Sequence, residues 1–229
     1  MTAAIVVFPG SNCDRDAAVA IAKLSGERPA MVWHRETALP PCDLVVIPGG
    51  FSYGDYLRCG AMAALSPIMR AVRARADDGV PVLGICNGFQ ILVEAGLLPG
   101  ALLRNASLRY ICKDVYVRVE TTATAASMAA GRGAVLRMPI AHNEGNYFAD
   151  AATLQMLEDD NRVVFRYCDR DGSISARANP NGSLANIAGI CNAARNVVGL
   201  MPHPERLFEP ELGGEDGAVV LRSALGLVA

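Results

Sequence analysis

Hydrophobic and polar positions alternate along the first half of the chain in two different rhythms. Residues 3–8 form a continuous apolar run that Pro9 and Gly10 end, which predicts a strand buried on both faces. Residues 14–24 place apolar side chains three and four positions apart and are followed by Gly26, which predicts a helix capped by glycine. The same criteria predict further strands at residues 29–33, 43–47 and 80–85, and helices at residues 60–76 and 88–95.

The second half of the chain is less regular. Valines alternate with more polar residues over residues 114–120, which predicts a half-exposed antiparallel strand. Further strands are expected at residues 162–167, 187–191 and 197–201, and a last helix at residues 217–227. Strands that alternate with helices favour a parallel sheet covered by helices. We therefore expect an α/β fold, with a mostly parallel sheet flanked by helices and an antiparallel extension. Without repeats or a long linker, residues 1–229 are expected to form one domain.

Composition and charge exclude several classes of protein. Of the 229 residues, 52% are hydrophobic and 19% are charged, which excludes an intrinsically disordered chain. The net charge is −2 and Lys and Arg are not clustered, so we expect no binding to nucleic acid. Prolines and polar residues interrupt the most apolar stretch, residues 80–103, and no basic region precedes the first apolar run. We therefore expect neither a membrane span nor a signal peptide.

The cysteines argue for a reducing environment. The seven cysteines are an odd number, scattered along the chain, and no two have the C-x-x-C spacing. With only His34, His142 and His203 to add, the sequence offers no recognisable zinc site, and we expect no metal. Free thiols of this kind are typical of a cytoplasmic protein.

The most informative segment is the predicted turn between residues 80–85 and 88–95. It reads Gly84-Ile85-Cys86-Asn87-Gly88, the cysteine version of a nucleophile elbow. Flanking glycines allow a tight turn that places Cys86 above the carboxyl edge of the sheet, where α/β proteins bind ligands. A buried structural cysteine beside two turn glycines is the alternative.

A nucleophilic thiol needs a base and a group that orients the base. His203 precedes Pro204, which disfavours helix at His203, and on an extended segment Glu205 would project to the same side. This pair is the preferred candidate, against the alternative of a surface loop. His34, at the end of a strand, has no carboxylate fixed beside it, and His142 lies in a polar segment that could shape a pocket.

An oxyanion hole needs two backbone donors close to the nucleophile. The amide of Asn87 follows Cys86 directly, and the glycines after the third strand, Gly49 and Gly50, offer a second donor. Neither this loop nor Gly10 belongs to a nucleotide-binding motif, so the sequence predicts no ATP or NAD site.

Four segments together resemble the class I (triad) glutamine amidotransferases. They are residues 9–14 (PGSNCD), 48–60 (PGGFSYGDYLRCG), 84–92 (GICNGFQIL) and 201–206 (MPHPER). The second of these is similar to one branch of the family, the glutaminase subunits of phosphoribosylformylglycinamidine synthases. The similarity covers nearly the whole chain.

This resemblance implies a flavodoxin-like fold and a role for each site residue. Cys86 would attack the side-chain amide of glutamine and form a γ-glutamyl thioester, His203 would move protons, and Glu205 would orient His203. The amides of Gly50 and Asn87 would hold the oxyanion. In addition, Gln90 would line the glutamine pocket.

The resemblance also implies partners. Ammonia would pass to a large ATP-dependent synthetase subunit, which makes formylglycinamidine ribonucleotide in de novo purine biosynthesis, and a small subunit often bridges the two. ATP and magnesium are expected on that partner and no cofactor on this chain. The chain departs from the family pattern at two places that concern the docking of partners. Asn143 replaces the usual glycine of a His-Gly-Glu-Gly segment, and asparagine is the best-tolerated substitute if that position needs a positive φ. The segment of residues 169–181 is longer than usual.

Two other functions stay open from the sequence. A free-standing cysteine hydrolase would use the same elbow on another γ-glutamyl or related amide substrate. A non-enzymatic relative would bind a synthetase without catalysis, but such a relative has normally lost the cysteine, the histidine or the glutamate.

Overall fold

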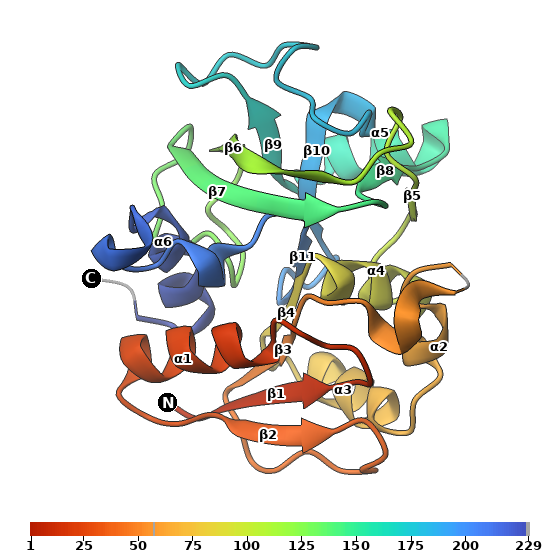
Figure 1. The fold of residues 1–229 in the computed structure, drawn as a ribbon, viewed down its shortest axis with the longest axis vertical. Helices are drawn as coiled ribbons and strands as arrows, with labels where there is room; N and C mark the ends of the chain where they lie inside the picture. Colours follow the sequence, from red (N-terminus) through yellow and green to blue (C-terminus); the bar gives the residue numbers. More distant parts are fainter. Residues whose placement is uncertain (57, 228–229) are drawn as a thin grey trace.

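One sheet of nine strands runs through the computed structural model, which describes residues 1–56 and 58–227 (Figure 1). Five neighbouring strands are parallel, in the spatial order β2 (Ala30–Trp33), β1 (Ala3–Val7), β3 (Leu44–Ile47), β4 (Val82–Ile85) and β11 (Val197–Leu200). This is the flavodoxin-like order, in which ligands bind where the strand order reverses, outside the carboxyl ends of β1 and β3.

The antiparallel extension continues the same sheet beyond β11. Its strands, in spatial order, are β10 (Ile187–Cys191), β9 (Val163–Cys168), β6 (Ile111–Val119) and β7 (Val135–His142). The valines of β6 are buried while the residues between them are partly exposed, as the alternating pattern predicts. A second sheet pairs β5 (Ala101–Leu103) with β8 (Asn146–Phe148). The expected α/β class with an antiparallel extension is confirmed.

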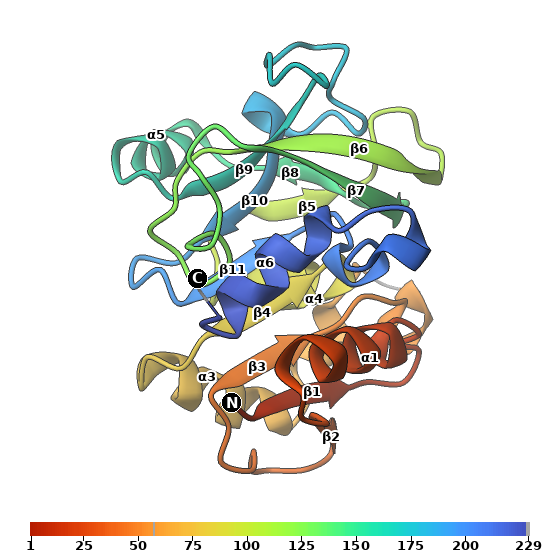
Figure 2. The same cartoon turned by 90° about the vertical axis from the view of Figure 1, so that its left-hand side faces the viewer.

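Helices cover both faces of the parallel strands. Figures 1 and 2 show α1 (Asp14–Ser25) and α6 (Asp216–Ala224) together on one face. The helices α2 (Ala61–Ala64), α3 (Ile68–Asp77) and α4 (Asn87–Glu94) lie on the other, and α5 (Ala151–Asp159) lies beside the antiparallel strands. The strands β1, β3 and β4 are buried on both faces almost throughout, which explains their continuous apolar runs.

Short 3₁₀ turns join several elements. They are η1 (Ser52–Asp55), η2 (Leu184–Asn186), η3 (Pro204–Arg206) and η4 (Pro210–Leu212). Among the described residues, no helix is both long and apolar enough to cross a membrane.

The single helix predicted over residues 60–76 is wrong, because the structure has two helices there. The first helix, α2, ends at Ala64, and α3 begins at Ile68, directly after Pro67. Proline lacks an amide hydrogen and disfavours the helical conformation of the residue before it, so Ser66 and Pro67 separate α2 from α3.

The sequence pattern also missed β5, β7, β8 and α5. The largest omission is β7, in which Leu136, Met138, Ile140 and His142 are buried in strict alternation. Pro139 interrupts the signal in the sequence, because proline weakens a strand prediction. The structure tolerates Pro139 since β7 is the edge strand of the sheet, where only one side of the strand needs partners.

Candidate active site

The turn between β4 and α4 holds Cys86 in a strained conformation. Its φ is 50° and its ψ is −105°, a region that residues other than glycine rarely occupy. The backbone of Gly88 packs so tightly on β3 that an added Cβ would collide with the carbonyl oxygen of Ile47. Cys86 is 4% exposed, and its amide donates to the carbonyl of Leu200 on β11 at 2.8 Å. The geometry is that of the elbow that the glycine spacing predicts.

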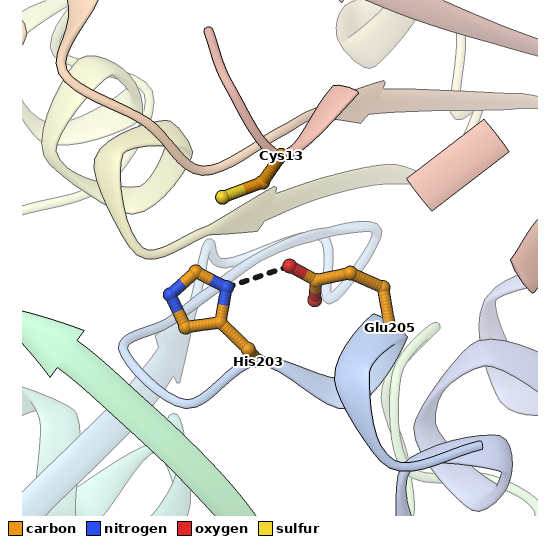
Figure 3. Close-up of side chains that lie close together, drawn as sticks. All are labelled: Cys13, His203 and Glu205. Carbon is orange, nitrogen blue, oxygen red and sulfur yellow. Dashed lines mark hydrogen bonds and ion pairs between the residues drawn. The ribbon is translucent and has the colours of Figure 1, made fainter. Parts of the chain in front are cut away.

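His203 and Glu205 form a hydrogen-bonded pair (Figure 3). The distance from His203 Nδ1 to Glu205 Oε1 is 2.6 Å, and the side chains are 2% and 0% exposed. The predicted extended backbone is wrong, because Pro204 starts the 3₁₀ turn η3. His203 itself is extended, with φ −102° and ψ 90°, and the turn that follows brings the carboxylate back to the ring.

The hydrogen bond fixes the tautomer of His203. A carboxylate only accepts hydrogen bonds, so in the neutral ring the proton sits on Nδ1 and Nε2 keeps its lone pair. Nε2 is buried and has no hydrogen-bond partner among the described residues. Burial opposes the charged ring, but Glu205 and Cys86 outweigh it and raise the pKa of His203. The site therefore favours an imidazole that accepts a proton at Nε2.

The two predicted oxyanion donors lie on adjoining segments. Gly50 follows β3 and has φ 147°, and an added Cβ would stand 2.6 Å from the carbonyl oxygen of Gly10. Asn87 begins α4, and its side-chain Oδ1 accepts from the amide of Ser52 at 3.2 Å. Neither the Gly50 amide nor the Asn87 amide donates to another group in the described part of the chain. Both are therefore free to bind an anionic oxygen.

Gln90 links α4 to the segment after β7. Its Oε1 accepts from Asn87 Nδ2 at 2.9 Å, and its Nε2 donates to the carbonyl of Glu144 at 2.5 Å. The side chain is 4% exposed. Its predicted contact with glutamine stays a prediction, and in this structure the amide holds the 142–145 segment against the elbow.

His142 lies at the end of β7 rather than in a loop, because β7 extends to this residue. Asn105 donates through Nδ2 to two carbonyls, and its Oδ1 accepts from the Gly145 amide and faces His142 Nδ1 at 3.0 Å. His142 Nδ1 must therefore be the donor. Burial and the neighbouring His203 lower the pKa of His142 to about 4, so the ring is neutral at pH 7. Asn143 does not have a positive φ, so this position does not need glycine.

His34 supports the loop after β3. Its Nδ1 lies 2.8 Å from the hydroxyl of Tyr53 and 3.3 Å from Ser66 Oγ. Tyr53 belongs to η1 and has a positive φ of 55°. His34 thus fastens the segment that carries Gly50 to the start of α3.

Sequence analysis gave no role to several residues that meet at the site. Cys13, from the turn after β1, lies beside His203 and Glu205 (Figure 3). Arg206 donates to the sulfur of Cys13 at 3.0 Å. Burial and the charge on Cys86 raise the pKa of the Tyr110 hydroxyl. Cys13 stands in the segment PGSNCD and Arg206 in the segment MPHPER. These segments follow β1 and β11, and their place at the carboxyl edge of the sheet was the available signal that both residues belong to the site.

Known glutamine amidotransferases are similar to this chain over its whole length. The model of the CobB/CobQ-like glutamine amidotransferase domain matches residues 1–212. Phosphoribosylformylglycinamidine synthase subunit PurQ of Rhodospirillum rubrum is 59% identical over 224 residues, which cover 97% of this chain and 97% of that protein. The subunit PurQ of Rhizobium meliloti is 55% identical over 229 residues and covers 100% of both chains.

Two solved structures are also similar to this chain. A chain in the structure of PurLQS from Thermotoga maritima matches with a TM-score of 0.86 and 44% identity, over 99% of this chain and 98% of that chain. The glutaminase domain of Trypanosoma brucei CTPS with bound acivicin matches with a TM-score of 0.62 and 13% identity, over 100% of this chain and 95% of that chain. At that identity the second match shows a shared fold only.

Proposed function

The chain belongs to the CobB/CobQ-like glutamine amidotransferase family, and from this premise we propose that it is the glutaminase subunit of a phosphoribosylformylglycinamidine synthase. The observation that carries the proposal is the strained Cys86 at the end of β4 beside the buried His203–Glu205 pair. Full-length similarity to PurQ subunits supports the substrate and the pathway, de novo purine biosynthesis.

The first chemical step is the attack of Cys86 on the side-chain amide of glutamine. His203 accepts the thiol proton at Nε2 while Nδ1 stays bonded to Glu205, and the sulfur bonds to the amide carbon. The carbonyl oxygen becomes an oxyanion, which the free amides of Gly50 and Asn87 are placed to bind. The imidazolium then gives its proton to the leaving nitrogen, so that ammonia departs and a γ-glutamyl thioester remains on Cys86.

The second step hydrolyses the thioester. His203 removes a proton from water, the hydroxide bonds to the thioester carbon, and Cys86 leaves as the sulfur that His203 reprotonates. The products are glutamate and the free enzyme. The same two donors serve the second oxyanion. Every group that takes part in the two steps belongs to this chain, to glutamine or to water, so we expect the glutaminase reaction to need no cofactor.

The partners follow from the product. Ammonia is consumed by the large synthetase subunit, on which we place ATP and magnesium, and a small subunit is expected to bridge the two. The relative in PurLQS supports a complex of this kind. All seven cysteines are free, which supports a reducing, cytoplasmic location.

The test separates the glutaminase reaction from the synthetase reaction. Purified chain is assayed for glutamate release with and without its synthetase partner, and the complex is assayed for product with glutamine or with ammonium. Replacing Cys86 with Ser is expected to abolish glutamate release and glutamine-dependent synthesis, and to leave ammonium-dependent synthesis intact.

Other results would contradict the proposal in distinct ways. Loss of both syntheses in Cys86→Ser would indicate a broken interface or fold. No glutamate release by the folded wild type, alone or with the synthetase, would favour a free-standing hydrolase of another γ-glutamyl substrate. We also expect glutamate release to be slower in the isolated chain than in the complex, because free hydrolysis wastes glutamine; equal rates would exclude this latency.

A further inference from the structure

Two residues of the motif segments have no part in the reaction described above. Cys13 immediately precedes α1, and Arg206 follows Glu205 in η3. Arg206 Nη2 donates a hydrogen bond to Cys13 Sγ at 3.0 Å, and Arg206 Nε lies 3.4 Å from a carboxylate oxygen of Asp16 in the first turn of α1. The guanidinium is therefore held between η3 and α1, with one side on the sulfur.

The sulfur of Cys13 lies against the catalytic pair. Cys13 Sγ, a ring nitrogen of His203 and a carboxylate oxygen of Glu205 all lie within 4.8 Å of one another (Figure 3). Figure 3 shows the sulfur beyond Cε1, the carbon between the two nitrogens of the ring. The backbone of Gly49 borders both groups, since a Cβ there would stand 2.7 Å from His203 Cε1 and 3.2 Å from Cys13 Sγ. Cys13 is 3% exposed, so its sulfur is buried together with the pair.

This spacing is that of a metal site, but the charges around it favour another role. Nδ1 of His203 is already bonded to Glu205, and the Arg206 cation touches the sulfur that would be the softest ligand. A metal ion would have to displace the guanidinium and break the His203–Glu205 hydrogen bond. The electron-rich sulfur faces instead the ring edge that becomes positive when His203 takes a proton.

We propose that Cys13 is a positioning residue for His203: its sulfur, oriented by Arg206, supports the imidazole on the Cε1 side while Glu205 holds it at Nδ1. The inference rests on the proposed function, in which His203 must keep its place through two proton transfers. Displacement of a catalytic ring by a fraction of an ångström slows such transfers, because the donor and acceptor no longer align.

Several groups act on the charge of His203 together. Burial opposes the protonated ring, whereas Glu205, Cys86 and Cys13 raise the pKa of His203. The titratable and charged groups around the ring are Glu205 and Arg206 from η3, Cys86 from the elbow, Cys13 from the start of α1, Tyr110 from the segment before β6 and His142 from β7. Loss of the Cys13 sulfur is therefore expected to lower the pKa of His203.

The test compares Cys13→Ser with Cys13→Ala in the full chain. Both side chains are smaller than cysteine by a similar volume, but only serine keeps an acceptor beside the ring. The chain has three histidines, so NMR titration resolves His203. We expect its pKa to fall in Cys13→Ala and to stay nearer the wild-type value in Cys13→Ser. In Cys13→Ala, kcat for glutamate release should fall about three- to tenfold, the worth of one hydrogen bond, with KM changed less than about twofold.

Two further variants isolate the effect. Cys191→Ala removes a buried thiol of β10, away from the site, and should leave the titration of His203 unchanged. Arg206→Met leaves the thiol in place but removes the group that orients it. Its effect on kcat should resemble that of Cys13→Ala, and the double variant should lose little more activity, because both act through the same sulfur. Loss of the nearby cation by itself raises the pKa of His203, so the pKa comparison is made between the Cys13 variants.

The inference is overturned if Cys13→Ala leaves the titration of His203 unchanged. It is also overturned if Cys13→Ser and Cys13→Ala reduce kcat equally, because Cys13 would then be a packing residue only. If Cys13→Ala does not fold, Arg206→Met and Cys13→Ser decide the question alone. A wild-type chain that folds but releases no glutamate, either alone or with its synthetase partner, would refute the proposed function, and the titration of His203 would still decide the inference.

Discussion

At the scale of single residues, Glu205 shows how much a buried carboxylate contributes to one imidazole. Its side chain is fully buried, its Oε1 binds His203 Nδ1, and its Oε2 has no hydrogen-bond partner among the described residues. A buried carboxylate with one free oxygen is costly unless its charge is used. In the proposed mechanism, the charge stabilises the imidazolium that forms in each proton transfer.

Replacing Glu205 with Gln tests this role of the charge. The amide keeps the shape and can still accept at Oε1, but the negative charge is lost, so the pKa of His203 should fall. Turnover of glutamine should fall on the order of 10²-fold, within the range of general acid–base catalysis. Alkylation of Cys86 by iodoacetamide should remain detectable, because the sulfur is still present.

Histidine NMR titration and glutamate release measure the two effects of Glu205→Gln. Glu209→Gln is a matched control, because Glu209 lies outside the pair and bonds Lys23. Unchanged turnover in Glu205→Gln would remove Glu205 from the site.

At the scale of elements, the loop after β3 depends on contacts with its neighbours. Its backbone bonds the turn after β1, from the Phe51 amide to Gly10 O at 2.9 Å and from the Tyr53 amide to Pro9 O at 2.7 Å. The hydroxyl of Tyr53 bonds His34 Nδ1 at 2.8 Å and Ser66 Oγ at 3.2 Å. These contacts fix a segment with positive φ at Tyr53, which is unfavourable on its own.

Removing the Tyr53 hydroxyl should therefore loosen the loop after β3, which carries the proposed oxyanion donor Gly50. Tyr53→Phe should lower the free energy of unfolding by about 1 kcal/mol, the net worth of a buried hydrogen bond, and lower kcat/KM severalfold because Gly50 is less firmly held. Urea unfolding and glutaminase kinetics measure both effects. Tyr56→Phe is the control, since Tyr56 is in the same loop but 90% exposed. Equal effects of the two changes would contradict the role of the Tyr53–His34 contact.

At the scale of the whole molecule, the nine-stranded sheet joins the site to distant strands. His142 lies at the end of the edge strand β7, and the amide of His203 donates to Pro139 O of the same strand at 2.9 Å. The carbonyl of Ala141 lies 3.8 Å from Cys86 Sγ. The antiparallel extension thus closes over the carboxyl ends of β4 and β11.

The buried His142 makes the stability of the whole fold depend on pH. Its pKa is lowered from 6.5 to about 4 by burial and by His203. Between these values the unfolded chain binds a proton that the folded chain does not, so stability falls as pH decreases from about 6.5 toward 4. The contribution that is lost is about 3 kcal/mol. His203 has the opposite sign: its raised pKa stabilises the fold below about pH 6.5, and that contribution is lost as pH rises through the folded value.

Urea unfolding of the wild type and of His142→Asn across this pH range isolates the His142 contribution. Asparagine keeps a donor toward Asn105 but does not titrate, so the variant should lose less stability between about pH 6.5 and pH 4. The same pH dependence in both proteins, or an NMR pKa near 6.5 for His142, would contradict this expectation.

The sequence by itself determined the features that arise from local backbone preferences. The glycines around Cys86 predict the elbow, because only a tight turn with close packing needs glycine at both positions, and the family resemblance is confirmed by relatives over the full chain. The alternation of Val115, Val117 and Val119 likewise predicts an antiparallel strand, since one face of that strand is exposed.

Only the tertiary structure decided which distant residues meet. Cys13 and Arg206 are 193 positions apart, and they touch because β1 and β11 end at the same edge of one sheet. Local patterns also failed where a neighbour overrides them: Pro139 lies within a strand because β7 is an edge, and Glu205 reaches His203 through a 3₁₀ turn rather than an extended segment. Local propensity is a property of a few consecutive residues, whereas these contacts depend on the order of strands, which the whole chain sets by burying its apolar faces together.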